Sequence, residues 1–556
     1  MPQRWGNCFS GGDVRVGGRV PEEPEPEVFS FAHPLPFWPP GGGFARGRIR
    51  IGGGELELAA ATAFEKICTL SSRRRGGGSA TFYRPVGVPA GFSLLGYYCQ
   101  PNCRPLHGHV LVARAGERPP GASPQPPPLC KPLDYALIWE FHAGGNCANA
   151  GHGYGRSDAY FWVPVPPVGY WAIGCLVTTE RRSPPLEEVA CVREDLTDEA
   201  CARCAEGCGG KGCAWAPSAA PLIGLPPREH GMACLGNAEL DLSAMPTLEQ
   251  AHAVIRHYGP TLFFHPKEVY LPSSVSWFFK NGAALYKRGG DTAGEEIDGE
   301  GSNLPGGGCN DGEYWIDVPG GERGRAVCRG NIDSAELYAH VKPAMGGTCT
   351  DVAMWVFCPF NGPARLKLGP ISLPLGKTGR HVGDWEHFTF RVSNLTGELM
   401  GVYYSQHSGG HWVDASALGY IDGNRPVVYS SRNGHASYAY PGVYLQGSAA
   451  LGVGIRNDAA RSSLFVDSSA RYRIVAAEYL GEGAVVEPQW LQFMREWGPT
   501  VVYKSRKRME WMVGRLPPRL RCRAESMLNK MPNELSREEG PTGPKEKNNW
   551  EGDERW

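Results

Sequence analysis

The chain has 556 residues, long enough for two or three domains, and its 56 basic against 57 acidic side chains provide no overall field that would attract nucleic acid. Its 75 glycines and 48 prolines are typical of turn-rich β architecture and argue against a helical bundle. The sequence shows neither an apolar leader nor 18 consecutive apolar residues, which predicts a cytoplasmic protein whose 18 cysteines are reduced thiols.

The N-terminal part is predicted to be disordered over residues 1–28 and to form one β domain over residues 29–195. This domain contains a degenerate repeat of an aromatic pair, Pro and Gly. The first copy is Phe82-Tyr-Arg-Pro85 followed by Pro89-Ala-Gly-Phe92; the second is Phe161-Trp-Val-Pro164 followed by Pro167-Val-Gly-Tyr170. Strand–turn–strand repeats that cannot bury a face alone predict a β-prism-like or barrel domain.

A connector rich in Cys, Gly and Pro is expected over residues 196–240. It contains Cys201, Cys204, Cys208 and Cys213. Structural zinc sites usually show two CxxC-type pairs separated by a dozen or more residues, and only one pair is present here. Zinc binding and a variable loop without metal therefore both stay open.

The C-terminal part is predicted to be a β-sandwich over residues 241–503 with a few peripheral helices, so that the whole chain is mainly β. Thr247-Leu-Glu-Gln250 is a capping box that opens a helix, which Gly259-Pro260 ends. Short alternating runs separated by turn signals follow, as in sandwiches. Residues 504–556 are expected to form a basic stretch, which could contact anionic lipid, and a polar tail over the surface.

The most informative stretch is His381-Val-Gly-Asp384-Trp-Glu386-His-Phe-Thr-Phe. Asp384 and Glu386 lie two residues apart in a strand-like alternation and therefore share a side with Phe388. Two acids on an apolar side repel each other unless a cation or hydrogen-bond donors meet them. This predicts a divalent-cation site at Asp384, Glu386 and His381, while bonding of the acids to backbone amides or Arg side chains is the alternative.

Three further histidines lie in turns downstream of the acid pair, namely His407, His411 and His435. Each is a candidate for completing a metal shell, for contacting a ligand or for acting as a base. Nucleotide binding is not predicted, because the Gly required at position 371 by a phosphate loop ending in Gly376-Lys-Thr is Ile.

From about Phe29 onward the chain resembles plant members of the vacuolar protein sorting-associated protein 62 family. The motifs that carry this resemblance are Thr81-Phe-Tyr-Arg-Pro-Val-Gly, Tyr160-Phe-Trp-Val-Pro, Tyr270-Leu-Pro-Ser-Ser-Val-Ser-Trp-Phe-Phe, Met354-Trp-Val-Phe-Cys-Pro-Phe-Asn-Gly-Pro, His381-Val-Gly-Asp-Trp-Glu-His, Gly434-His-Ala-Ser-Tyr and Gly540-Pro-Thr-Gly-Pro-Lys. One departure is Lys267, where the family pattern leads us to expect an acid. The resemblance implies a role in delivery to the vacuole.

A shorter likeness is to necrosis-inducing plant-pathogen toxins, which carry Gly-His-Arg-His-Asp-Trp-Glu on a β-sandwich. The toxin residues that bind a divalent cation fall on His381, Asp384 and Glu386, whereas the second toxin His falls on Gly383. The likeness implies a divalent cation at these positions. Its identity stays open, because oxygen-rich ligation favours Mg²⁺, Ca²⁺ or Mn²⁺, whereas one imidazole favours Mn²⁺ or Zn²⁺.

Two functions follow as expectations. The preferred one is a non-enzymatic protein, cytoplasmic and peripheral on an endomembrane, whose cation site presents a membrane lipid or glycan headgroup. Its rival is a metal-dependent hydrolase in which the cation activates water and His407 or His435 is the base. A scaffold without a cation is the third alternative.

Overall fold

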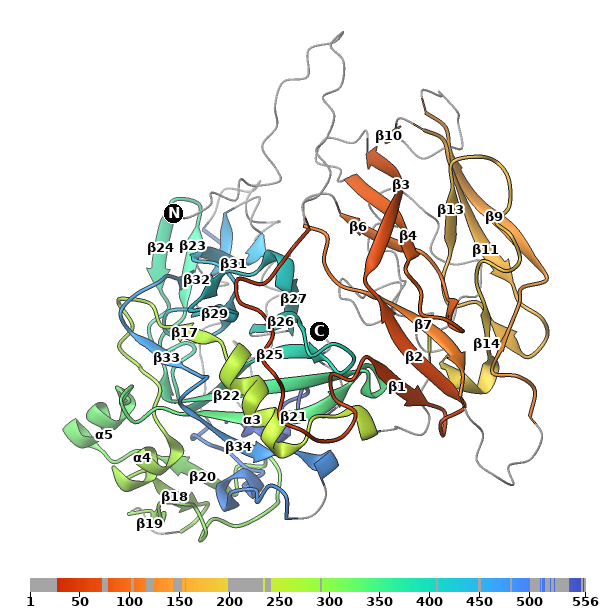
Figure 1. Cartoon of the computed structure of the whole chain (residues 1–556). Coiled ribbons are helices and arrows are strands. Elements are labelled where there is room, and N and C mark those ends of the chain that lie inside the picture. The colour runs from red at the N-terminus through yellow and green to blue at the C-terminus, as the bar shows by residue number, and fades with distance from the viewer. Residues whose placement is uncertain are drawn as a thin grey trace.

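The computed structural model places most of the chain in two β lobes (Figure 1). It describes residues 28–500 except for 73–78, 102–104, 117–124, 144–152, 156, 199–233, 236–241, 291–292, 407–408, 449–451 and 481–482, and beyond them residues 511, 513–515, 521, 525, 540–551 and 554. The predicted disordered segment, the four connector cysteines and most of the basic stretch lie outside these residues. The mainly β prediction is confirmed.

The N-terminal lobe consists of small antiparallel sheets, each of them open in the described residues, without the closure of a barrel. Two of the sheets have four strands each: β1 (Arg48–Ile51), β2 (Leu56–Ala61), β7 (Val110–Ala115) and β5 (Ser93–Leu94); and β10 (Gly153–Gly155), β3 (Ala63–Ser72), β4 (Ser79–Val86) and β6 (Tyr98–Pro101). The other two have three strands each: β13 (Leu176–Thr178), β11 (Ala159–Val165) and β9 (Asp134–Phe141); and β12 (Tyr170–Trp171), β14 (Cys191–Arg193) and β8 (Leu129–Cys130).

The two copies of the repeat have similar local structure. The aromatic-Pro segments are strands β4 and β11, and the rings of Phe82 and Phe161 pack edge to face with centroids 5.0 Å apart. The turns agree in detail, because Gly91 and Gly169 have φ values of 80° and 81°. The ends of the two units meet where a Cβ on Gly96 would lie 2.8 Å from a backbone carbon of the second copy.

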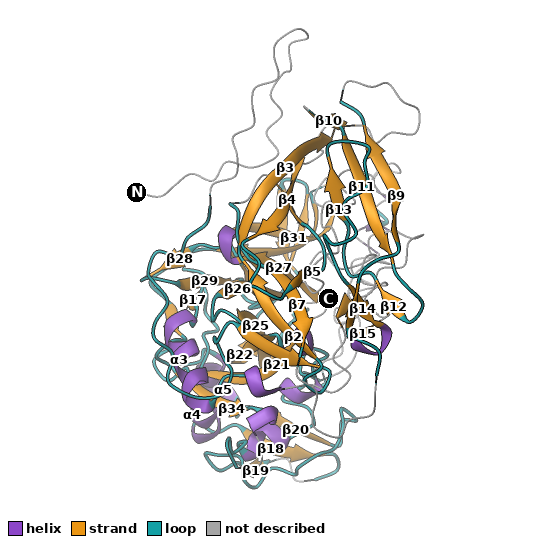
Figure 2. Ribbon diagram, turned by 45° about the vertical axis from the view of Figure 1, so that its right-hand side comes forward, coloured by secondary structure: helices purple, strands orange, loops and turns teal. Residues whose placement is uncertain are grey.

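The C-terminal lobe is built around a six-stranded sheet (Figure 2). Its strands are, in order, β27 (Gly409–Asp414), β26 (Leu399–Gln406), β25 (His381–Ser393), β22 (Cys349–Asn361), β21 (Leu337–Ala344) and β34 (Tyr472–Ala476). The facing five-stranded sheet contains β28 (Tyr420–Ile421), β29 (Arg425–Ser430), β17 (Thr261–Phe263), β33 (Phe465–Asp467) and β30 (Ser437–Tyr438). The core between these sheets includes Met354, Phe388, Leu262 and Val428.

The predicted helix is present as α3 (Leu248–Tyr258), and its capping box is formed, because the Thr247 and Gln250 side chains bond each other's backbone N–H groups. Its apolar side packs into the same core.

The opposite face of the six-stranded sheet is covered as well, so the sandwich has a further layer. Aromatic side chains pack there, among them Trp355, Phe357, Trp385 and Trp497. Two helices and a three-stranded sheet lie beside this aromatic layer (Figure 1). The helices are α4 (Val275–Lys280) and α5 (Gly321–Cys328), and the sheet consists of β19 (Glu295–Glu296), β18 (Ala284–Lys287) and β20 (Tyr314–Asp317). A four-stranded sheet of β24 (Ile371–Pro374), β23 (Arg365–Leu368), β32 (Val453–Ala459) and β31 (Gly442–Ser448) completes the lobe.

Two segments differ from the sequence-based expectation. Residues 29–45, which we assigned to the N-terminal domain, contact the C-terminal lobe, where Phe44 joins the core and the ring of Phe29 stacks on Tyr420. The polar tail was expected to trail over the surface, and this was wrong for its described part. Trp550 is 5% exposed, and the side chain of Glu554 is fully buried.

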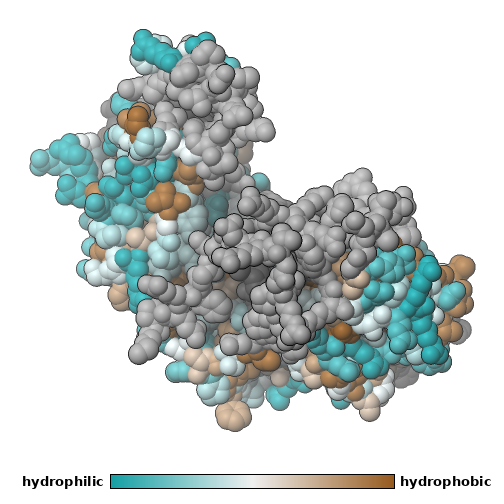
Figure 3. Space-filling model, turned by 90° about the horizontal axis from the view of Figure 1, so that it is seen from above, coloured by the Kyte–Doolittle hydropathy of each residue, from teal (hydrophilic) through white to brown (hydrophobic). Residues whose placement is uncertain are grey.

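The hairpin of β15 (Thr197–Asp198) and β16 (Cys234–Leu235) brings the two ends of the connector together. Seen from above, the described surface is a mixture of hydrophilic residues and small separate hydrophobic spots (Figure 3). Among the described helices, none has both the length and the apolar character needed to cross a bilayer.

Candidate functional site

The site lies at the beginning of β25, in the middle of the six-stranded sheet. This strand pairs with β22 so that Asp384 lies opposite Cys358 and Glu386 opposite Val356. Further along, Phe388 enters the core between the sheets, whereas Trp385 packs in the aromatic cluster on the other side. The alternation predicted from the sequence is therefore confirmed, and it buries Asp384 on the sandwich side.

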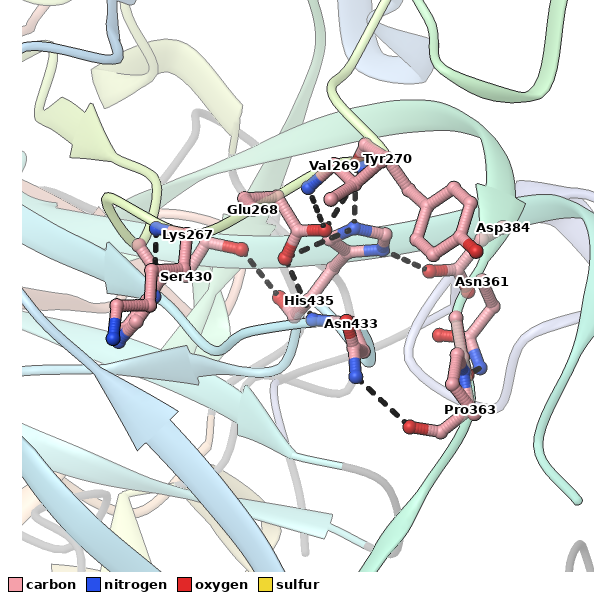
Figure 4. Close-up of polar contacts among 12 residues, drawn as sticks. Lys267, Glu268, Val269, Tyr270, Asn361, Pro363, Asp384, Ser430, Asn433 and His435 are labelled. Carbon is pink, nitrogen blue, oxygen red and sulfur yellow. Dashed lines mark hydrogen bonds and ion pairs between the residues drawn. The ribbon is translucent and has the colours of Figure 1, made fainter. Parts of the chain in front are cut away.

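The carboxylate of Asp384 is held by a histidine from a distant turn. His435, which lies between β29 and β30, has its Nδ1 2.7 Å from Oδ2 of Asp384 (Figure 4). Both side chains are nearly inaccessible, with exposed fractions of 1% for His435 and 8% for Asp384. His435 and Asn433 have positive φ values of 55° and 72°, a conformation that non-glycine residues rarely adopt. The backbone of this turn is thus strained, and in this conformation the imidazole points at Asp384.

A second carboxylate flanks the imidazole from the segment between β17 and α4. Oε2 of Glu268 is 4.0 Å from Nε2 of His435 and accepts the backbone N–H of Asn433 at 2.6 Å. Its Oε1 accepts the N–H groups of Val269 and Tyr270 at 2.8 and 2.9 Å. The glutamate therefore ties its own loop to the histidine turn (Figure 4).

The electrostatics follow from this arrangement. Burial alone would lower the pKa of His435, but its contacts with Cys358, Asp384 and Glu268 outweigh that effect and raise the pKa well above its ordinary value. Burial would raise the pKa of Asp384, and the hydrogen bond and charge of His435 lower it instead, helped by His381 and Lys547. The pair is thus an imidazolium and a carboxylate, and Nε2 donates to the carbonyl oxygen of Tyr270 at 2.9 Å.

The three predicted cation ligands are only partly brought together. The His381 ring lies close enough to Asp384 to feel its charge, although burial dominates and lowers the pKa of His381, which keeps the ring neutral. Its Nδ1 is 3.1 Å from the carbonyl oxygen of Gly383. Glu386 is half-buried on the same side and lies near Tyr438. Within the described ranges, no group of three or more His, Cys, Asp or Glu side chains is arranged to hold a metal ion.

The other two candidate histidines are His407 and His411. His411 lies on β27 opposite Tyr404, two strands away from β25, and its Nδ1 is 3.1 Å from the side-chain nitrogen of Gln406. It therefore does not join Asp384. His407 lies outside the described residues. Of the two candidates that the structure describes, His435 contacts Asp384 and His411 does not.

Sequence reasoning missed Glu268. We had singled out its neighbour Lys267 as the position where an acid was expected, yet it is Glu268 that turns inward and is buried. No local pattern links Glu268 to residues 165 positions later. The available signal was the turn Asn433-Gly-His435, whose residue types tolerate a left-handed backbone.

The chain is weakly similar to several solved structures. The GNIP1Aa structure from Chromobacterium piscinae is 19% identical, with 27% of this chain and 26% of that chain covered and a TM-score of 0.20. A structure described as NLPPya in complex with glucosamine is 14% identical, with 38% and 66% covered and a TM-score of 0.19. Scores this low support no argument.

Two relatives from Saccharomyces cerevisiae are similar in sequence. Vacuolar protein sorting-associated protein 62 is 27% identical over 186 residues, and the putative vacuolar protein sorting-associated protein TDA6 is 26% identical over 195 residues. Each match covers 30% of this chain, and 38% and 39% of the two relatives' own lengths.

A family model covers far more of the sequence. The model described as vacuolar protein sorting-associated protein 62 matches residues 25–206 and 223–554, which include the site, the repeat and the tail. The chain therefore belongs to the vacuolar protein sorting-associated protein 62 family.

Proposed function

We propose that this chain is a non-enzymatic protein of vacuolar sorting that works at the cytoplasmic surface of an endomembrane. It binds the polar headgroup of a membrane lipid or glycan at the Asp384 site, through a divalent cation. Family membership supports the vacuolar part of this proposal. The geometry around Asp384 supports the binding part.

The observation that carries the proposal is a carboxylate that is anchored from one side and still reaches the surface. Oδ2 of Asp384 is bonded to His435, and the side chain retains 8% exposure. A carboxylate fixed in this way, with the neutral imidazole of His381 close by, can meet a cation or a ligand donor from solvent. Headgroup hydroxyls, ammonium groups and divalent cations all have the required chemistry.

The donors suit Mg²⁺, Ca²⁺, Mn²⁺ or Zn²⁺, since carboxylate oxygens are joined by the neutral imidazole of His381. Because Asp384, Glu386 and His381 are not gathered as a ligand group among the described residues, the binding free energy must include the cost of moving them together. Affinity should therefore be modest.

The state of His435 favours binding over hydrolysis. A general base needs a free nitrogen lone pair within reach of the proton that it removes. Nδ1 of His435 is bonded to Asp384, and Nε2 donates to the carbonyl of Tyr270. Both ring nitrogens of His435 thus face acceptors within the protein, and neither is directed at a bound ligand.

The experiment measures thermal unfolding of the full-length protein in chelator and in each of MgCl2, CaCl2, MnCl2 and ZnCl2. A cation that binds the native state raises Tm with concentration. We expect this rise for the wild type and not for Asp384→Asn, while Asp422→Asn, which alters an exposed ion pair, behaves like the wild type. If none of the four ions raises Tm, or if Asp384→Asn responds equally, the cation part is rejected.

Flotation with vesicles that carry phosphoinositide or glycolipid, with and without the effective ion, tests the headgroup part. Wild-type protein should float with one of these vesicle types and Asp384→Asn should not. Equal flotation of the two proteins would reject the Asp384 site as the headgroup site. The basic stretch at residues 504–530 stays a separate prediction, with about 1 kcal/mol expected per well-placed Lys or Arg on anionic lipid.

A further inference from the structure

The second face of the six-stranded sheet is polar at one end and is covered by the C-terminal segment, defined here as residues 540–551 with Glu554. The segment joins the lobe through backbone bonds: the N–H of Trp497 donates to the carbonyl of Pro541 at 2.7 Å, and Glu496 pairs with Thr542. It then crosses the sheet and ends at Lys342, His387 and Thr389. These three side chains come from two strands, β21 and β25.

Glu554 is the polar anchor of the segment. The hydroxyl of Thr389 donates to Oε1 at 2.5 Å, and His387 Nε2 and Lys342 Nζ lie 3.5 and 3.7 Å away. Burial alone would raise the pKa of Glu554, but His387, Lys342 and Thr389 outweigh it and lower the pKa to about 2. The carboxylate is therefore ionised in a pocket built from one ammonium, one imidazole and one hydroxyl.

Lys342 is the cation of this pocket. Its side chain is only 4% exposed, and an uncompensated buried ammonium would be strongly destabilising. Lys342 Nζ donates to the carbonyl oxygen of Asn549 at 2.7 Å and pairs with the carboxylate of Glu554, and both residues belong to the C-terminal segment. On the sheet itself, the cross-strand neighbour of Lys342 is Asp351, whose carboxylate accepts two hydrogen bonds from Arg391, so the ion pair of Lys342 is made with the C-terminal segment.

An aromatic position precedes the anion pocket. The ring of Trp550 stacks on His340 with centroids 4.0 Å apart and lies 5.9 Å from the ring of Trp355. Trp355 also stacks on His387, at 4.4 Å, and its buried indole N–H has no acceptor in the described residues. The ring of Trp550 and the carboxylate of Glu554, four positions later, therefore bind to adjoining parts of one surface.

We propose that this face is a binding site for an extended acidic peptide with an aromatic residue four positions before a glutamate. The protein's own C-terminal segment is its resident occupant, and a segment of the same chemistry from another chain displaces it. A face carrying Lys342, His387 and Thr389 tolerates water when uncovered, unlike the apolar core on the opposite side of the sheet. This site is separate from the Asp384 site and does not depend on the proposed function.

Covalent attachment explains why the protein's own C-terminal segment occupies the site in preference to a free peptide. It is presented to its own site at an effective concentration on the order of millimolar, so a free peptide of equal intrinsic affinity competes poorly. Weakening the resident anchor while leaving the sheet intact should therefore open the site to an added peptide. Glu554→Gln has this effect, because it removes the charge from the segment and leaves the pocket unchanged.

The test uses a fluorescein-labelled peptide of residues 540–556 and full-length proteins, with binding followed by fluorescence anisotropy. We expect Glu554→Gln protein to bind the peptide at least tenfold more tightly than wild type does. Adding Lys342→Met to that variant should abolish the gain, as should a peptide that itself carries Glu554→Gln. Glu551→Gln, an exposed charge in the same segment, is the matched control and should behave like wild type.

Hydrogen exchange of residues 540–550 provides the second measurement. In Glu554→Gln it should become at least tenfold faster while β25 stays protected. The proposal is overturned if Glu554→Gln binds the peptide no better than wild type, if binding is insensitive to Lys342→Met, or if exchange in the segment is unchanged. It is also overturned if Glu554→Gln unfolds the lobe, because the segment would then be a permanent part of the core.

Discussion

Replacing Asp384 with Asn removes one charge from the buried pair with His435 and keeps the shape of the side chain. Removing one partner of a buried ion pair costs about 3–5 kcal/mol when the other charge is left uncompensated. Here an amide oxygen can still accept from Nδ1, and Glu268 lies 4.0 Å from Nε2, so we place the expected loss at about 3 kcal/mol in the free energy of unfolding.

The loss should depend on pH in a defined way. The folded pKa of His435 is raised, so its contribution to stability is complete below the unfolded value of 6.5 and disappears as pH rises through the folded pKa. The folded pKa of Asp384 is lowered, so its contribution is present above the unfolded value of 3.8 and is lost on acidification. The difference between wild type and Asp384→Asn should therefore be largest between pH 3.8 and 6.5.

Urea denaturation at a series of pH values measures this difference. Asp422→Asn is the matched control, because its ion pair with Arg425 spans 3.1 Å but the aspartate side chain is 68% exposed, and its loss should stay below about 1 kcal/mol. A loss below about 1 kcal/mol for Asp384→Asn, or one that is equal at pH 5 and at strongly alkaline pH, would refute the assignment of a buried imidazolium–carboxylate pair.

Three other outcomes are expected. Gly383→Ala should lower the free energy of unfolding by about 3 kcal/mol in chemical denaturation, because φ is 67° and the new Cβ would overlap the backbone of Trp497. Gly96→Ala should lower the free energy of unfolding by about 2 kcal/mol, because its Cβ would lie 2.8 Å from the backbone of the other repeat copy. Gly419→Ala, which has open space around it, is the control for both variants. Equal losses of stability in all three variants would contradict this reasoning. The protection factors of the amides in residues 540–550, which are corrected for the intrinsic exchange rate at each pH, should fall as pH falls from 4.5 to about 2. The stabilisation from the lowered pKa of Glu554 is present above the unfolded value and is lost through the folded one, so protection factors that do not change with pH would show that the Glu554 charge does not anchor the segment.

The parts of the fold that rest on short-range patterns were predictable. Alternation placed Asp384 and Phe388 on one side of a strand and Trp385 on the other, as the two cores confirm. The capping box at Thr247 marked the start of α3 because it involves only neighbouring residues. The repeat was visible because the same turn chemistry recurs, with Gly91 and Gly169 in the same backbone conformation.

The long-range part of the site was not predictable from one sequence. Asp384 seemed to need a cation because nothing nearby balances it, and the structure supplies an imidazolium from 51 residues further along the chain. The pairing depends on the strained turn at His435 and on Glu268 on another loop, and neither has a periodic signature. The tail was misjudged for a similar reason: its composition is polar, yet Trp550 and Glu554 find a matching polar face.

The covering of that face also has a consequence for biosynthesis. Asn549, whose carbonyl meets Lys342, follows it by 207 residues, and Glu554 follows His387 by 167. While a ribosome is still making the intervening chain, β21 and β25 can take their places on either side of β22, but Lys342 and His387 have not yet met their partners in the C-terminal segment. The nascent lobe therefore stays incomplete until Glu554 has emerged from the ribosome. A protein fused directly after the C-terminal segment should slow the docking of that segment more than a protein fused before the N-terminal lobe.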